Sequence, residues 1–331
     1  MLDDAPPPPS VPRDAPPAPP DDGAAGRAPG PGGPLGAPVA IVVPLCAPDG
    51  ARAEGRLYLA EGPVLAGVVL TPAMGVAARY YDAFASELAS LGLTVLVAEL
   101  RGIATSSVRA GRAVDFGYYE LAALDLPAAL AALRERCRGV PIFLAGHSLG
   151  GQISLLFAAL FPGEVAGVAL MASGSPHYLG WPAGVRLGVL GVFGLLTRIS
   201  RGLGYLPGRA LGFGGREARR LIAEWAAWGR TGRLEPRGAP PALDRAFAQI
   251  DLPVLSLSFG GDRWAPFGPI EELLAMVPRA PKTRVHFRRG ALGAPVDHFR
   301  WAKHPARPAR ALADWALDAA VRGGAGRAPR S

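Results

Sequence analysis

The chain of 331 residues has few cysteines and few lysines: Cys46 and Cys137 are its cysteines, and Lys282 and Lys303 are its lysines. Two cysteines build no disulfide framework, and the sequence has no Cys/His cluster with metal-ligand spacing. It also has no glycine-rich phosphate loop, so we expect neither a metal nor an organic cofactor. The formal charge of +8 comes mainly from scattered arginines, without a basic stripe that contains aromatics. We therefore expect no nucleic-acid partner.

The sequence also lacks the pattern of a signal peptide, because its first residues are acidic and lead into prolines. Polar residues interrupt the uncharged stretches 139–163 and 165–185. The apolar run Leu187–Thr197 is shorter than the ~20 residues that cross a bilayer. We expect a cytoplasmic protein without stable membrane insertion, and the oligomeric state is left open.

Composition divides the chain into five parts. Residues 1–38 are rich in Pro, Ala, Gly and Asp, which predicts a disordered tail. In residues 39–175 and again in 251–322, apolar strand patterns alternate with helical patterns, which predicts an α/β fold with a mostly parallel sheet and helices on both faces. Residues 176–250 lack strong strand patterns and predict a helical cap inserted over the sheet. Residues 323–331 are expected to form a flexible tail.

The expected elements follow from period-2 and period-3.6 patterns of apolar residues. The expected strands cover residues 39–43, 56–60, 66–71, 93–98, 142–145, 165–171, 253–259 and 283–288. The expected helices cover residues 80–91, 119–136, 152–161, 185–199, 217–228, 271–277 and 305–322.

The stretch Pro141–Gly151 contains the strongest motif. Ile142–Ala145 is typical of a buried strand, Gly146–Gly150 fits G-x-S-x-G, and a helical pattern begins at Gln152. A strand, a tight turn with serine at its apex and a helix are the context of a nucleophile elbow, so Ser148 is the expected nucleophile. Glycines on both sides of the turn would let the strand and the helix approach closely. Free N–H groups at the helix N-terminus would favour developing negative charge.

A serine nucleophile needs a base and an acid that orients the base, and in this architecture they follow in the order Ser, Asp or Glu, then His. His298 lies in the loop after the last expected strand and is the expected base. Asp262 follows the preceding strand at a Gly-Gly turn and is the expected acid. Asp297 competes with it, but we expect an exposed loop carboxylate because Asp297 adjoins the base. The remaining histidines suit the base less well: His147, His177, His286 and His304.

The tetrahedral intermediate of acyl transfer needs two N–H donors. We expect one from the backbone of Leu149, the residue after the nucleophile. The second should come from the loop 72–75 after the third strand, where we assign Met74. The alternative for Met74 is ordinary packing, since methionine often fills gaps in cores.

Together these stretches resemble the α/β-hydrolase superfamily, near its serine-aminopeptidase-like, monoglyceride-lipase-like branch, and more closely a bacterial group of predicted α/β hydrolases. The resemblance covers roughly residues 39–320 and implies the α/β-hydrolase fold. It also implies Ser148 as nucleophile, Asp262 as acid and His298 as base, with Leu149 and Met74 as oxyanion donors. The matching stretches are PAMG at 72–75, RYY at 79–81, RGI at 101–103, GHSLGGQ at 146–152, ASGS at 172–175, LPG at 206–208, EWAAW at 224–228, and Asp262 with Ala265-Pro266.

Two stretches depart from the pattern of these relatives. Pro72-Ala73 stands where many of them have His-Gly, which concerns the oxyanion loop. Asp297-His298-Phe299 stands where the closer group tends to have Gly-His-Phe, which adds a second carboxylate beside the base.

The sequence thus predicts a serine hydrolase that cleaves an ester or thioester of an apolar acyl group, a small-molecule substrate, through an acyl-enzyme. Leu, Trp and Phe in the expected cap suit such a group, and part of this set, which includes Phe193 and Trp228, would line its pocket. For any single residue of the set, packing against the main domain is the favoured interpretation. A peptidase or an acyltransferase on the same triad is an alternative, as is a non-catalytic ligand-binding protein with this fold. The intact Ser148, Asp262 and His298 disfavour the last of these.

Overall fold

The structure, a computed structural model, describes residues 40–212 and 214–325, so the expected tail over residues 1–38 lies outside the described residues. Its centre is an eight-stranded sheet in the order β1-β2-β4-β3-β5-β6-β9-β10. Its strands are β1 (Ile41–Cys46), β2 (Arg52–Tyr58), β3 (Ala66–Thr71), β4 (Leu93–Val97), β5 (Ile142–His147), β6 (Gly167–Met171), β9 (Val254–Phe259) and β10 (Lys282–Phe287). β2 is antiparallel to β1 and β4, while the other neighbours are parallel. The expectation of a mostly parallel α/β sheet is confirmed.

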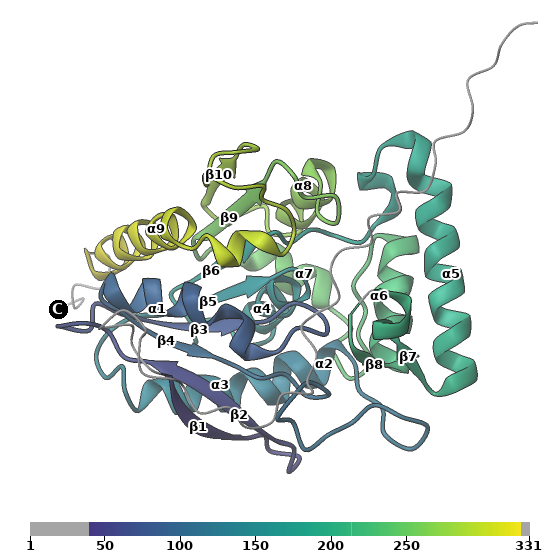
Figure 1. The fold of residues 1–331 in the computed structure, drawn as a ribbon, viewed down its shortest axis with the longest axis horizontal. Coiled ribbons are helices and arrows are strands. Elements are labelled where there is room, and N and C mark those ends of the chain that lie inside the picture. Colours follow the sequence, from purple (N-terminus) through teal and green to yellow (C-terminus); the bar gives the residue numbers. More distant parts are fainter. Residues whose placement is uncertain (1–39, 213, 326–331) are drawn as a thin grey trace, which may run out of the picture.

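Helices cover both faces of this sheet (Figure 1). α1 and α9 lie on one face, and α3, α4 and α7 lie on the other. Because both faces are covered, every residue of β3, β4, β5 and β6 is buried. The helices of these layers are α1 (Asp82–Ser90), α2 (Tyr118–Glu120), η2 (Leu121–Asp125), α3 (Leu126–Arg134), α4 (Leu149–Leu160), α7 (Leu243–Gln249), α8 (Phe267–Ala275) and α9 (Ala306–Ala325). Short turns of helix also form at η1 (Ala78–Tyr81) and η6 (Arg300–Lys303).

The chain leaves the sheet between β6 and β9 to form the cap, on the right of Figure 1. Its main helices, α5 (Arg186–Leu203) and α6 (Arg219–Thr231), pack side by side. A short antiparallel ribbon of β7 (Tyr205–Pro207) and β8 (Arg216–Ala218) joins them, which the sequence analysis missed because three-residue strands carry too little alternation. α7 lies within residues 176–250, where a cap is expected, but it packs against α4 on the face of the sheet that α3 and α4 cover.

The largest differences in helix boundaries occur where glycine or proline stands in a first or last turn. α8 begins at Phe267, before the expected residue 271, although Gly268 and Pro269 follow at once. Proline is tolerated there because the first N–H groups of a helix have no intrahelical partner. α9 continues to Ala325 through Gly323 and Gly324, beyond the expected end at residue 322.

One helix in the described part of the chain, Ala183–Leu203, is long and apolar enough to cross a membrane by length and composition alone. The helix extends past both ends of the apolar run Leu187–Thr197, which by itself is shorter than a membrane span. Within the structure 22% of its apolar window is buried, and the helix lies on the outer side of the cap (Figure 1). The absence of stable membrane insertion stays a prediction.

Candidate active site

The turn between β5 and α4 holds Ser148 in a strained backbone conformation. Its φ of 53° is positive although it is not glycine. At Gly150, a Cβ atom would lie 2.1 Å from the carbonyl oxygen of Thr71. No other residue type therefore fits this crossing of the helix start over β3, as the motif predicts. α4 begins at Leu149, before the expected residue 152. Its first turn contains Gly150 and Gly151, and glycine is a weak helix former, so the sequence pattern did not indicate this turn.

Asp262 and His298 form a buried pair. The Nδ1 atom of His298 lies 2.9 Å from Oδ2 of Asp262, and both residues are less than 10% exposed, at 5% and 8%. The other carboxylate oxygen of Asp262, Oδ1, accepts hydrogen bonds from the backbone N–H groups of Trp264 and Ala265, at 2.8 and 2.9 Å. The carboxylate is thus held by three bonds, and its orientation fixes the imidazole.

A glycine brings the two loops of this pair together. A Cβ atom at Gly261 would lie 1.9 Å from the carbonyl oxygen of Val296, so only glycine allows this approach. The Gly-Gly turn after β9 therefore has a steric reason.

Asp297, the competing acid, does not bond to His298. Its Oδ1 accepts hydrogen bonds from the N–H groups of Phe299 and Arg300, at 2.9 and 2.8 Å, so it caps its own loop. Its side chain is 40% exposed, in agreement with the expectation of a loop carboxylate.

The two expected oxyanion donors lie at one cavity with Ser148 and His298. Leu149 is the first residue of α4, and Met74 lies in the loop after β3. Within residues 40–212 and 214–325, neither backbone N–H donates to a protein acceptor. Their role as oxyanion donors stays a prediction.

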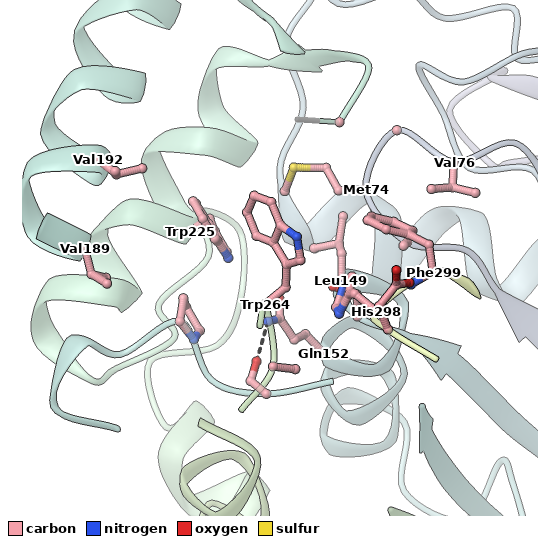
Figure 2. Close-up of a pocket in the computed structure, with 18 of the residues that line it drawn as sticks. Met74, Val76, Leu149, Gln152, Val189, Val192, Trp225, Trp264, His298 and Phe299 are labelled. Atoms are coloured by element: carbon pink, nitrogen blue, oxygen red, sulfur yellow. Dashed lines mark hydrogen bonds between the residues drawn. The ribbon is translucent and has the colours of Figure 1, made fainter. Parts of the chain in front are cut away.

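The cavity beside Ser148 has a volume of about 1000 Å³ and lies between the cap and the sheet (Figure 2). The side formed by the cap is apolar. It consists of Val189 and Val192 of α5 and Trp225 of α6, which lie opposite the residues of the main domain (Figure 2). The apolar lining comprises Met74, Val76, Trp181, Val185, Val189, Val192, Phe193, Trp225, Trp264 and Phe299. Charged side chains enter the lining from one segment, at Asp297, Arg300 and Lys303.

The cap candidates Phe193 and Trp228 have different surroundings. Phe193 lines the cavity and packs edge-on against Trp225, with ring centroids 4.8 Å apart. Trp228 is 1% exposed, does not line the cavity, and packs edge-on against Tyr118. Trp228 therefore takes the packing role that was the favoured interpretation for any single residue of this set, whereas Phe193 lies at the cavity.

His147, the histidine inside the elbow, takes a structural position. His147 is buried, and the hydroxyl of Tyr81 lies 2.7 Å from its Nδ1. Burial, together with the interaction with His298, holds the pKa of His147 well below its usual range. The sequence analysis missed Tyr81; its only signal was its place in the stretch Arg79-Tyr80-Tyr81. Among the residues that the structure describes, no group of three or more His, Cys, Asp or Glu could hold a metal ion.

Comparisons with known proteins agree with this fold. Residues 62–199 match the family described as serine aminopeptidase, S33. A monoglyceride lipase homolog of monkeypox virus is 33% identical over 92 residues, which are 28% of this chain and 32% of that protein. The match thus spans about a third of the relative's length.

Two solved structures show the same fold over most of the chain. The monoacylglycerol lipase of Paleococcus ferrophilus has a TM-score of 0.55 at 20% identity, over 80% of this chain and 98% of that one. A soluble variant of monoglyceride lipase from Saccharomyces cerevisiae, in complex with a substrate analog, has a TM-score of 0.60 at 17% identity, over 88% of this chain and 99% of that one. The chain thus has the α/β-hydrolase fold, and it is similar to proteins of the serine-aminopeptidase-like, monoglyceride-lipase-like branch of that superfamily.

Proposed function

We propose that this protein is a serine hydrolase that cleaves an ester or thioester of an apolar acyl group through an acyl-enzyme. The observation that carries the proposal is the bonded pair of Asp262 and His298 at the same apolar cavity as Ser148. A nucleophile, a base and an orienting acid are the parts that acyl transfer requires.

In the proposed mechanism, Ser148 Oγ attacks the acyl carbon while His298 Nε2 takes its proton. Asp262 accepts the Nδ1–H of the imidazole, which leaves the lone pair on Nε2 and stabilises the imidazolium that forms. The N–H groups of Leu149 and Met74 stabilise the oxyanion. His298 then protonates the leaving group, and a water molecule, deprotonated by the same residue, releases the acid.

The cavity supports an apolar acyl group as the part of the substrate that it binds. Its volume of about 1000 Å³ is at the upper end of ligand pockets, and its cap side is formed by valine, tryptophan and phenylalanine. Lipase and esterase names among the relatives agree with a small-molecule ester.

Two measurements test the proposal. A fluorophosphonate probe should label wild-type protein at Ser148 and leave Ser148→Ala unlabelled. A panel of p-nitrophenyl esters of rising chain length should be hydrolysed, while aminoacyl anilides should be poor substrates. Failure of both the labelling and the ester panel would favour a ligand-binding protein, and preference for the anilides would favour a peptidase.

A further inference from the structure

The hydroxyl group of Tyr81 joins two parts of the site. Tyr81 ends η1, is 0% exposed, and does not line the cavity. Its oxygen accepts a hydrogen bond from the backbone N–H of Ala73 at 3.0 Å. The same oxygen lies 2.7 Å from Nδ1 of His147. Since the oxygen accepts from Ala73, its own proton is free for the ring nitrogen.

The first bond holds the loop that carries the proposed oxyanion donor. The carbonyl oxygen of Ala73 accepts a hydrogen bond from the N–H of Val76, at 3.1 Å. That carbonyl and the N–H of Met74 belong to one planar peptide unit and point in opposite directions. With the N–H of Ala73 bonded to Tyr81, the residue is held on both sides. Pro72 has no N–H that could add a further anchor.

The second bond holds a ring that packs on the proposed base. The rings of His147 and His298 have centroids 4.9 Å apart. The hydroxyl of Tyr81 holds this ring at Nδ1, while the Nε2 atom of the ring is buried. Burial keeps His147 neutral, so it adds no positive charge beside His298 when that residue takes a proton.

We propose that Tyr81 is a positioning residue: its hydroxyl ties the oxyanion loop at Ala73 to the histidine that packs against the base. This inference rests on the proposed serine hydrolase function. The ring of Tyr81 packs on its neighbours whether or not the hydroxyl is present, with Trp301 at 6.3 Å and Tyr80 at 5.3 Å between centroids. Tyr81→Phe therefore removes the link and keeps the packing.

The test compares Tyr81→Phe with wild type and with Tyr58→Phe, a control at another buried tyrosine, on β2 outside the cavity lining. Rates are normalised to the fraction of protein that the fluorophosphonate labels. Two inhibitors of equal chain length are titrated: octyl boronic acid, which forms a tetrahedral anion on serine, and 1-octanol, which only fills the apolar cavity. Thermal unfolding of each variant is measured in parallel.

Loss of one oxyanion donor costs about 10²–10³ in kcat, so its misplacement in Tyr81→Phe should lower kcat by about 10–100-fold, with KM within about twofold. Affinity for the boronic acid should fall by about tenfold or more, while affinity for the alcohol should not change. Equal losses for both ligands, or a normalised kcat like that of Tyr58→Phe, would overturn the inference. Wild-type protein without labelling or ester turnover would instead refute the proposed function.

Discussion

His298 Nδ1 lies 2.9 Å from Asp262 Oδ2, although the two residues are 36 positions apart in the chain. β9 and β10 run parallel, so the loops that follow them meet at the same edge of the sheet. Asp297, adjacent to His298, instead accepts hydrogen bonds from the backbone of its own loop. The carboxylate that bonds to His298 is therefore the one brought near by the order of the strands, and not the one adjacent to His298 in sequence.

We predict opposite outcomes for the two neighbouring carboxylates. Asp262→Asn should lower kcat by about 10³–10⁴-fold, because the amide no longer favours the imidazole tautomer with a free Nε2. Asp297→Asn should change kcat by less than about threefold, since an amide oxygen can still accept from the loop. Steady-state kinetics on one ester decide this, and the reverse ranking would assign the acid to Asp297.

We predict that a side chain at Gly188 shortens the accepted acyl chain. Gly188 lines the cavity, and a Cβ atom there has no neighbour within 4 Å, so Gly188→Leu should extend into the space for the acyl group. Gly191 on the same helix is equally open but does not line the cavity, which makes Gly191→Leu a matched control. Both changes should favour the helix.

The readout is kcat/KM across the ester panel. One methylene in an apolar pocket is worth about 1–3 kcal/mol, so the longest ester used by wild type should lose about tenfold or more relative to a short one. The same profile for the two leucine variants would exclude this wall of the cavity from the acyl site.

The two aromatic residues of the cap should separate stability from specificity. Trp228→Ala should lower the free energy of unfolding by about 3–5 kcal/mol and leave the preferred chain length unchanged, since the side chain is core. Phe193→Ala should move the preference toward longer chains, since it widens the cavity. Denaturant unfolding and the ester panel, measured on both variants, would contradict this assignment if Trp228→Ala shifted the preference.

Glu217 should make the protein less stable as pH rises. The carboxyl accepts a hydrogen bond from the N–H of Gly215, but burial raises its pKa from 4.5 to about 7. Between these values the folded state binds the proton and the unfolded state does not, so the free energy of unfolding falls as pH rises through this window. The full effect is on the order of 3 kcal/mol above pH 7.

Glu217→Gln keeps an acceptor for Gly215 and removes the charge. Its melting temperature should exceed that of wild type at pH 8 and approach it near pH 4.5. The exposed Glu61→Gln serves as the control. A difference between Glu217→Gln and wild type that does not change with pH would show that the carboxyl is not protonated in the folded protein.

The sequence predicted the sheet and the loops at its carboxyl edge because those features depend on local patterns. The buried strands are short apolar runs, and the G-x-S-x-G turn has a steric requirement that Gly150 makes visible. Features that depend on packing between distant segments were missed or misplaced. Trp228 packs against Tyr118, and Tyr81 is bonded to Ala73 and His147. The periodicity of apolar residues does not predict either set of contacts.

The order of the strands has a consequence for synthesis of the chain. β3 lies between β4 and β5, so the centre of the sheet can form from the first half of the protein. The strand β9 and the loops that carry Asp262 and His298 are translated last, after the cap. A nascent chain that ends before Val254 therefore carries the proposed nucleophile and the cap but neither the proposed acid nor the proposed base, so the proposed triad can assemble only after the last strands have been synthesised.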